Sequence, residues 1–252
     1  MTEPRTLDPA ADLTRQIAAN RALALQPLAI VGGAAGALAV LAIVLAVVLG
    51  PAALVLVFVA GGLAFGGVRR LGTGEQQALA LCSATLAAPT AEARLYNVVD
   101  GLCASTGIAP PALLVVDDPS CNCFVVGKDP RRASLVVTRG LLRHFEPIEL
   151  EGIVAQQLGQ IRNLTIAPAT VGVAWPPLRA KLGEHREYLA DCTAVDITRY
   201  PPGLAAALEK MLDHRGEAGP VVALTQLAHL WTDPPGVTSS PLELRAAALR
   251  ER

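Results

Sequence analysis

Three glutamines occur within the segment 149–163, where the side chains are best placed to form an enclosed polar site. In a helix, Gln156 and Gln160 are four residues apart and lie on the same face. No charged residue occurs between Glu151 and Arg162, whereas a solvated helix face usually carries charge. Because buried amides cost free energy unless they are hydrogen-bonded, this pattern predicts a polar face that lines a cleft.

The residues around these glutamines predict a helix that packs in the core. Pro147 suits the first turn, and the acidic Glu149 suits the positive end of the helix dipole. Four apolar residues fall on one stripe, which is typical of a core-facing helix: Leu150, Val154, Leu158 and Ile161.

Several stretches of the chain resemble one protein family. Residues 138–142 (TRGLL), 149–163 and 187–191 (EYLAD) resemble the active-site region of the HtpX-like membrane zinc metalloproteases, which are gluzincins related to the CAAX prenyl endoprotease. Residues 240–245 (SPLELR) resemble the family's closing H-P-P-x-E-x-R, with Ser in place of the usual His. In this family an H-E-x-x-H helix supplies two zinc ligands and a general base, and a later E-x-x-x-D supplies the third ligand and a supporting Asp.

The motif positions of this chain depart from the family pattern. Gln156, Gln157 and Gln160 replace the two histidines and the glutamate, while Glu187 and Asp191 match the later motif. Amide oxygens are weak zinc ligands, and without zinc or a base no water is activated. The sequence therefore predicts no catalytic residue, no metal and no cofactor at these positions.

The two remaining carboxylates need other partners, because a carboxylate that faces an empty apolar cleft is penalised. We expect Glu187 and Asp191 to pair with Arg162 or Arg186, so that arginine and the glutamine amides replace zinc as the bridge between the two helices. The alternative is that both acids are exposed on a helix surface. The four histidines (His144, His185, His214 and His229) show no metal-binding spacing.

A second candidate site lies in the segment 121–127 (CNCFVVG), which resembles the family's N-A-F-A-x-G strand through Asn122, Phe124 and Gly127. In the family this strand lies near the substrate cleft, so the resemblance implies that a peptide could add to it through main-chain hydrogen bonds. The alternative is an ordinary edge strand with Phe124 in the core. Cys121 and Cys123 point to the same face of such a strand, a weak sign of a metal or redox pair.

The composition is typical of a membrane protein and argues against a nucleic-acid partner. Of the 252 residues, 52% are hydrophobic and 17% are charged, with a net charge of −1. Residues 22–68 carry no charge, and Gly50-Pro51 divides them into apolar stretches at 27–49 and 52–68. This predicts a transmembrane helical hairpin in the lipid bilayer. A buried helical pair in a soluble core is the alternative.

The charges at the ends of the hairpin predict its orientation. Arg15 and Arg21 precede it, Arg69 and Arg70 follow it, and the connecting turn carries no charge. The positive-inside rule then places both termini and the main domain in the cytoplasm, with the hairpin in the inner (plasma) membrane. In that reducing compartment the five cysteines should be free thiols.

The predicted fold is α+β and mainly helical. We expect a cytosolic arm at residues 1–25, the hairpin at 26–70 and an HtpX-like gluzincin domain at 71–252. Three strands should form a small antiparallel sheet (113–117, 123–127 and 134–138), and the apolar run 163–178 should be buried or graze the membrane. Further helices are predicted at 74–88, 92–106, 184–199, 204–214, 220–230 and 241–251.

These observations together predict a membrane-anchored, catalytically inactive metalloprotease homologue (a pseudoprotease) that binds a peptide or a membrane-protein partner. Two alternatives stay open. The chain could be an active HtpX-like metallopeptidase with an unusual metal site, or a structural subunit of a membrane complex.

Overall fold

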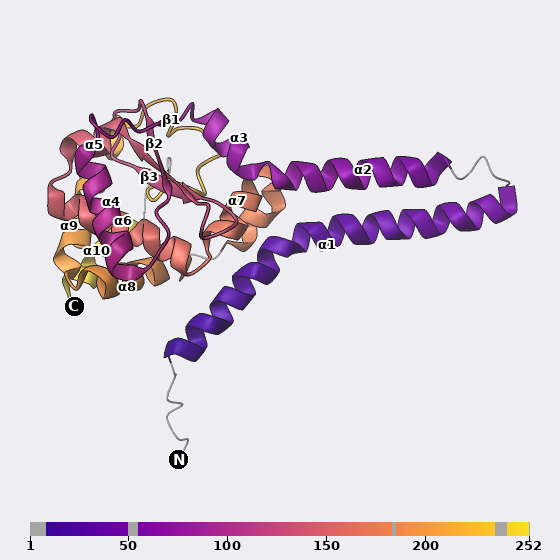
Figure 1. Cartoon of the computed structure of the whole chain (residues 1–252), viewed down its shortest axis with the longest axis horizontal. Helices are drawn as coiled ribbons and strands as arrows, with labels where there is room; N and C mark the ends of the chain where they lie inside the picture. Colours follow the sequence, from indigo (N-terminus) through magenta and orange to yellow (C-terminus); the bar gives the residue numbers. More distant parts are fainter. Residues whose placement is uncertain (1–8, 50–54, 183–184, 235–240, 252) are drawn as a thin grey trace, which may run out of the picture.

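Two long helices project side by side from a globular part of the chain (Figure 1). The computed structural model describes residues 9–49, 55–182, 185–234 and 241–251. The projecting helices are α1 (Pro9–Leu49) and α2 (Val55–Gly72). The predicted break at Gly50-Pro51 lies outside the described residues.

Helix α1 contains an apolar segment that is long enough to cross a membrane. The segment Thr14–Leu41 has 28 residues and a mean hydropathy of 1.8, and only 6% of its most apolar window is buried inside the structure. Apolar side chains stay exposed along both helices, such as Val47 at 84% and Phe58 at 80%. Since α1 runs without interruption from Pro9, residues 9–25 of the arm predicted at 1–25 are part of the same helix.

The sheet has four strands and is mixed, so the prediction of an antiparallel sheet is wrong. The strands are β1 (Thr85–Leu86), β2 (Ala112–Val116), β3 (Cys123–Val126) and β4 (Ser134–Thr138), in the order β1-β2-β4-β3. Strands β2 and β4 run parallel, while the other two pairs are antiparallel. Strands β2, β3 and β4 are apolar almost throughout, without alternation of apolar and polar residues. This pattern is typical of strands covered on both faces, and it was the feature of the sequence that could have predicted a parallel pair.

Helices cover both faces of the sheet and form two separate cores. On β2, Leu113 and Val115 pack into one core while Leu114 and Val116 pack into the other, because successive side chains point to opposite faces. The first core includes residues of α4 (Ala93–Thr106), α6 (Pro147–Arg162) and α9 (Pro201–Asp213), and the second includes residues of α3 (Gly74–Leu81) and α7 (Ile166–Ala174). The remaining helices are α5 (Arg139–His144), α8 (His185–Thr198) and α10 (Pro241–Arg250), with short 3-10 turns at Pro176–Lys181 and Arg215–Glu217.

Two predicted helices differ from the structure for local reasons. The first, at 74–88, ends at Leu81, because Ser83 has a φ of 49° and the chain then joins the sheet as β1. The second, at 220–230, is absent: residues 220–230 form turns. The buried carboxylate of Asp118 accepts the N–H groups of Gly219 and Val222 at 3.1 and 3.2 Å, which fixes that stretch as a turn.

The apolar run 163–178 is buried from Asn163 to Ala174, as one of the two predicted possibilities stated, whereas Pro176 and Pro177 are exposed. Every residue of α7 is buried, and α7 packs against α1 and α3. The side-chain amide of Asn20 in α1 donates to the carbonyl of Asn163 at 3.1 Å. The base of the long helical pair is therefore fixed to the globular part near the end of α6.

A close backbone contact at Gly140 gives a test of this architecture. A Cβ atom at Gly140 would lie 1.8 Å from the Pro119 carbonyl oxygen. We therefore expect Gly140→Ala to destabilise the protein by about 2 to 3 kcal/mol, measured by chemical unfolding in detergent. Gly101→Ala is the control: it lies in α4 with open space around it, and it should stabilise by roughly 0.5 to 1 kcal/mol. Equal effects of the two substitutions would contradict the Gly140 contact.

Candidate functional site

Helix α6 forms one wall of the candidate site, and its sequence fixes where it starts. The backbone N–H of Glu146 donates to Glu149 Oε2 at 2.7 Å, and Pro147 occupies the first turn. The predicted apolar stripe is buried, and so are the three glutamines: Gln156 is 0% exposed, Gln157 1% and Gln160 4%. The prediction of an enclosed polar face is therefore confirmed.

Helix α8 packs across α6 and brings Glu187 to the glutamines. A Cβ atom at Gly159 would lie 2.9 Å from the Ala190 carbonyl oxygen, so the missing side chain allows this approach. Gln156 Nε2 donates to Glu187 Oε2 at 2.9 Å, and Gln160 Nε2 reaches the same oxygen at 3.3 Å. Two amides thus converge on one carboxylate oxygen.

The third glutamine extends this network to the sheet. Gln157 Nε2 donates to Gln156 Oε1 at 2.5 Å and to Thr232 Oγ1 at 2.9 Å. Thr232 Oγ1 in turn donates to the Cys123 carbonyl at 2.9 Å. Nothing in the sequence pointed to Thr232, because it follows a stretch of turns and has no motif around it.

Asp191 is neutralised by Arg245 of α10. Arg245 Nε and Nη2 donate to the two oxygens of Asp191 at 2.6 and 2.7 Å, and its Nη1 lies 3.8 Å from Glu187 Oε2. The Arg245 side chain is only 1% exposed. Burial by itself lowers the pKa of Arg245, but the nearby carboxylates of Asp191 and Glu187 outweigh burial and raise the pKa.

The predicted partners of the two acids are partly confirmed. Arg186 Nε lies 3.0 Å from Glu187 Oε1, as predicted for one of the two candidate arginines. This contact is a charge attraction without hydrogen-bond geometry, since Glu187 Oε1 has no hydrogen-bond partner. Arg162 is exposed on the last turn of α6, so its predicted role is wrong. The sequence signal for Arg245 was its match to the final Arg of the family's closing segment; Ser240 of that segment lies outside the described residues.

Arg186 is held in place by a hydrogen bond to the backbone of His229, whose own side chain is neutral. Its guanidinium donates to the carbonyl of His229, whose Nε2 contacts the Ala169 carbonyl oxygen at 3.1 Å. Burial lowers the pKa of His229 to about 4, helped by the positive charges of Arg179 and Arg186 and opposed by the Ala169 contact. His229 is therefore uncharged at neutral pH and adds no cation near the carboxylates.

The residues at the motif positions do not fit a zinc ion. A catalytic zinc needs three lone-pair donors and an open position for water. Here the side-chain NH2 groups of Gln156 and Gln160 both point at Glu187, and the cationic Arg245 lies beside the same carboxylate. These groups compensate the negative charge of Glu187 directly, so no hydrolytic step through zinc follows from this arrangement.

All three predicted peptide-binding residues are buried around strand β3. Asn122 bonds both the N–H and the carbonyl of Asp233, at 3.2 and 2.7 Å. Phe124 is 0% exposed and packs edge-on against Trp231, with ring centroids 4.6 Å apart, as the alternative of a core side chain stated. The N–H of Gly127 donates to Thr170 Oγ1 at 2.9 Å. A role in peptide binding stays a prediction.

The outer edge of β3, which faces away from β4, is already hydrogen-bonded at both ends to other residues of the chain. The backbone N–H of Thr232 donates to the Cys123 carbonyl at 3.0 Å, and Thr170 bonds Gly127 at the other end. Burial raises the pKa of both Cys121 and Cys123 to about 12, so both are neutral thiols at neutral pH. This disfavours the suggested metal or redox pair.

The fold brings together two histidines that are far apart in the sequence. The rings of His144 and His214 lie with their centroids 4.3 Å apart, and His214 Nδ1 lies 3.1 Å from Glu217 Oε1. Three potential ligand atoms from His144, His214 and Glu217 thus meet, although the spacing of the histidines in the sequence showed no metal-binding pattern. Sequence spacing missed it because His144 ends α5 whereas His214 follows α9.

Removal of Arg245 tests the buried charge cluster. We expect Arg245→Leu to destabilise the protein by about 3 to 5 kcal/mol, because the buried Asp191 loses its cation and Glu187 keeps only Arg186. Arg250→Leu is the control on the same helix: Arg250 pairs with Glu209 on the surface, with 48% and 43% of the side chains exposed, and its loss should change little. Chemical unfolding of both variants in detergent measures the difference. A small effect of Arg245→Leu would contradict the cluster.

Curated proteins named protease HtpX homologues are similar to this chain. The one from Dictyoglomus thermophilum is 34% identical over 46% of this chain and 53% of its own length. Those from Tropheryma whipplei and Listeria monocytogenes are 32% and 29% identical, over 56% and 46% of this chain and 63% and 57% of their own lengths. No family model matches the chain, and no solved structure does.

These relatives confirm one prediction and contradict another. All three are named proteases, which favours an active protease. The prediction of an inactive pseudoprotease, and with it the prediction that the chain is not an enzyme, is contradicted by these names and has no support from them. The chain spans between about half and two thirds of the length of these relatives. Over that shared region the chain is similar to HtpX homologues, as its motifs predicted.

Proposed function

We propose that this chain is a membrane-anchored protease of the HtpX type that acts on polypeptides at the membrane surface. The observation that carries the proposal is the similarity to three proteins named proteases, at 29 to 34% identity. The apolar segment of α1 supplies the anchor, because a largely exposed segment of 28 residues with a mean hydropathy of 1.8 is long enough to cross a bilayer.

The arrangement in the membrane follows from the positive charges. In this proposal residues 26–70 form the transmembrane hairpin, and Arg15, Arg21, Arg69 and Arg70 mark its cytoplasmic ends. Both termini and the gluzincin-like domain at 71–252 then lie on the cytoplasmic side of the plasma membrane. A substrate would reach the domain from the cytoplasm or from the membrane surface.

The polypeptide would pair with the outer edge of β3, next to the three glutamines. That edge is occupied at Cys123 by Thr232, so a peptide would have to replace the segment around Thr232. Such a replacement also breaks the bond between Gln157 and Thr232, which couples substrate entry to the α6–α8 site. Main-chain hydrogen bonds make this pairing independent of most substrate side chains.

A cleavage assay tests the proposal. The full chain, produced in a host without its own HtpX-type protease and held in nanodiscs, should cleave fluorescently labelled casein faster than a mock preparation. Glu187→Ala should lower the rate at least tenfold, because it removes the carboxylate that joins Gln156 and Gln160. Glu209→Ala, which alters only a surface ion pair, should keep the full rate.

Two results would refute the protease proposal. One is a casein signal no higher than that of the mock preparation, with and without added divalent metal ions. The other is cleavage that Glu187→Ala leaves unchanged, which would assign the activity to a contaminant or to another part of the molecule.

A further inference from the structure

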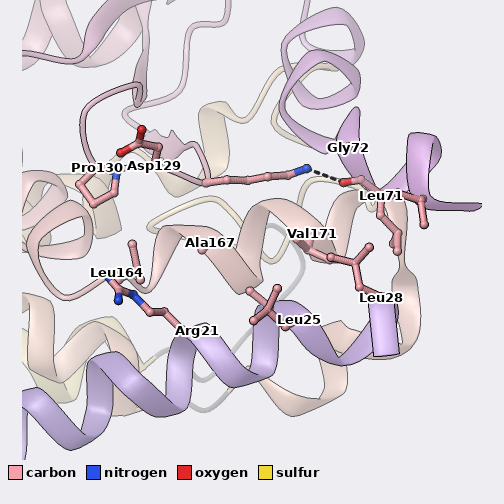
Figure 2. A pocket seen from close by; sticks show the side chains of 13 residues that line it. Arg21, Leu25, Leu28, Leu71, Gly72, Asp129, Pro130, Leu164, Ala167 and Val171 are labelled. Carbon is pink, nitrogen blue, oxygen red and sulfur yellow. Dashed lines mark hydrogen bonds between the residues drawn. The ribbon is translucent and has the colours of Figure 1, made fainter. Parts of the chain in front are cut away.

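A cavity of about 500 Å³ lies where the long helical pair meets the globular part (Figure 2). Its walls come from α1, the end of α2, the turn at 128–130 and α7. Most of the lining is apolar and includes Leu25, Leu28, Leu71 and Val171. This volume is in the range of pockets that bind small molecules.

Two cationic side chains, Arg21 and Lys128, and one acid, Asp129, line this mainly apolar cavity. Lys128 Nζ donates to the Leu71 carbonyl at 2.7 Å and keeps further N–H groups for another acceptor (Figure 2). Among the described residues, no hydrogen bond or ion pair occupies the guanidinium of Arg21. The acid among the lining residues, Asp129, accepts from the backbone N–H of Arg131 at 3.0 Å, and its carboxylate points away from Arg21 (Figure 2).

The cavity lies at the end of the apolar surface of α1. Leu25 and Leu28 line the cavity and are also 57% and 38% exposed, so the same helix face continues outward along the apolar segment. Arg69 and Arg70 end α2 beside the cavity, as basic residues do where a helix leaves the bilayer. A ligand with an anionic head and an apolar tail matches both halves of this site.

We propose that this cavity binds one anionic phospholipid from the surrounding membrane. The phosphate binds the guanidinium of Arg21, and the upper part of an acyl chain lies against Leu25, Leu28 and Val171. Lys128 adds positive charge from the other end of the cavity (Figure 2). The rest of the lipid stays in the bilayer beside α1. A soluble phosphate would use the cations and leave the apolar walls exposed, so the apolar lining favours the lipid.

Native mass spectrometry of lipid retained by the full chain tests this site. The protein is taken from nanodiscs that contain phosphatidylcholine and phosphatidylglycerol. We expect one phosphatidylglycerol to be retained in preference to phosphatidylcholine, and the double variant Arg21→Gln, Lys128→Gln to retain at least tenfold less of it. The matched control, Arg15→Gln with Arg132→Gln, removes the same charge from the same helix and the same turn, at residues outside the cavity, and should retain it.

A third variant tests the apolar half of the site. Ala167→Phe places a ring in the cavity without a change of charge and should also reduce retention. If the double variant and its control lose equal amounts of phosphatidylglycerol, the lipid is held by general attraction to positive surface charge, and the proposal is overturned. Equal retention of the two lipids by the unmodified chain would overturn it as well. If Ala167→Phe does not fold, as judged by thermal unfolding, the charge variants decide alone.

A separate observation points to a metal site near the start of α6, away from the glutamines in the second half of that helix. His144, His214 and Glu217 each offer one ligand atom, and these three atoms lie within 4.8 Å of one another. They come from the ends of α5 and α9 and from the following 3-10 turn. The nearby Lys210 ammonium is neutralised by Glu149 Oε2 at 2.5 Å, which reduces its repulsion of a metal cation.

We infer that these three side chains bind a divalent transition metal such as zinc. Two imidazoles and one carboxylate form a donor set that zinc prefers, and bonds of about 2.1 Å place the ligand atoms at separations that small side-chain rotations can reach. This inference does not depend on the proposed protease function. It has a practical consequence, because zinc in the purified protein would not by itself place a metal between α6 and α8.

Zinc titration against a chromophoric chelator tests the metal site on the untagged full chain. We expect one zinc ion per chain, with affinity reduced at least 100-fold in His144→Ala, His214→Ala and unchanged in Glu187→Gln. Thermal unfolding without metal shows that the double variant is folded, since both side chains lie at the surface or are half-buried. No zinc binding by the unmodified chain, or equal binding by the histidine variant, would refute the site.

Discussion

The burial of two carboxylates between α6 and α8 is the constraint on which the centre of this structure depends. Glu187 and Asp191 belong to a helix that packs tightly on α6, and Asp191 is only 4% exposed. A buried carboxylate is tolerated only with a cation or several hydrogen-bond donors. In this chain the donors come from Gln156 and Gln160 and the cations from Arg245 and Arg186. These groups lie on α6, α8 and α10, so charge compensation joins α10 to the central helices. The turn at 229–233 is joined to them by the bonds from Arg186 to His229 and from Gln157 to Thr232.

The same constraint explains how this chain departs from the metalloproteases it resembles. In the family pattern, the later E-x-x-x-D helix is held against the H-E-x-x-H helix by zinc. Here the amides of Gln156 and Gln160 make that connection by donating to Glu187, while Arg245 joins α10 to the same helix. The relatives are nevertheless named proteases, so the expectation of an inactive chain is corrected, and the proposed activity cannot rely on zinc held by these three glutamines.

The sequence predicted the parts of the site that depend on local pattern. The absence of charge between Glu151 and Arg162 correctly indicated a buried amide face, and the lack of a metal ligand correctly indicated that Glu187 needs an arginine, Arg186. Arg245 and Thr232 were missed as partners because contacts across 54 and 75 residues are set by tertiary packing. The pairing of β2 with β4 and the turns at 220–230 were missed for the same reason: the first depends on a chain crossover and the second on the distant carboxylate of Asp118.

Anomalous diffraction at the zinc absorption edge, from crystals of the full chain grown with zinc, tests the central claim most directly. The account predicts that Gln156 and Gln160 both contact Glu187, that Arg245 lies beside Glu187, and that no anomalous peak occurs within bonding distance of these residues. A strong peak bonded to Glu187 and to the side chains of Gln156 or Gln160 would contradict it.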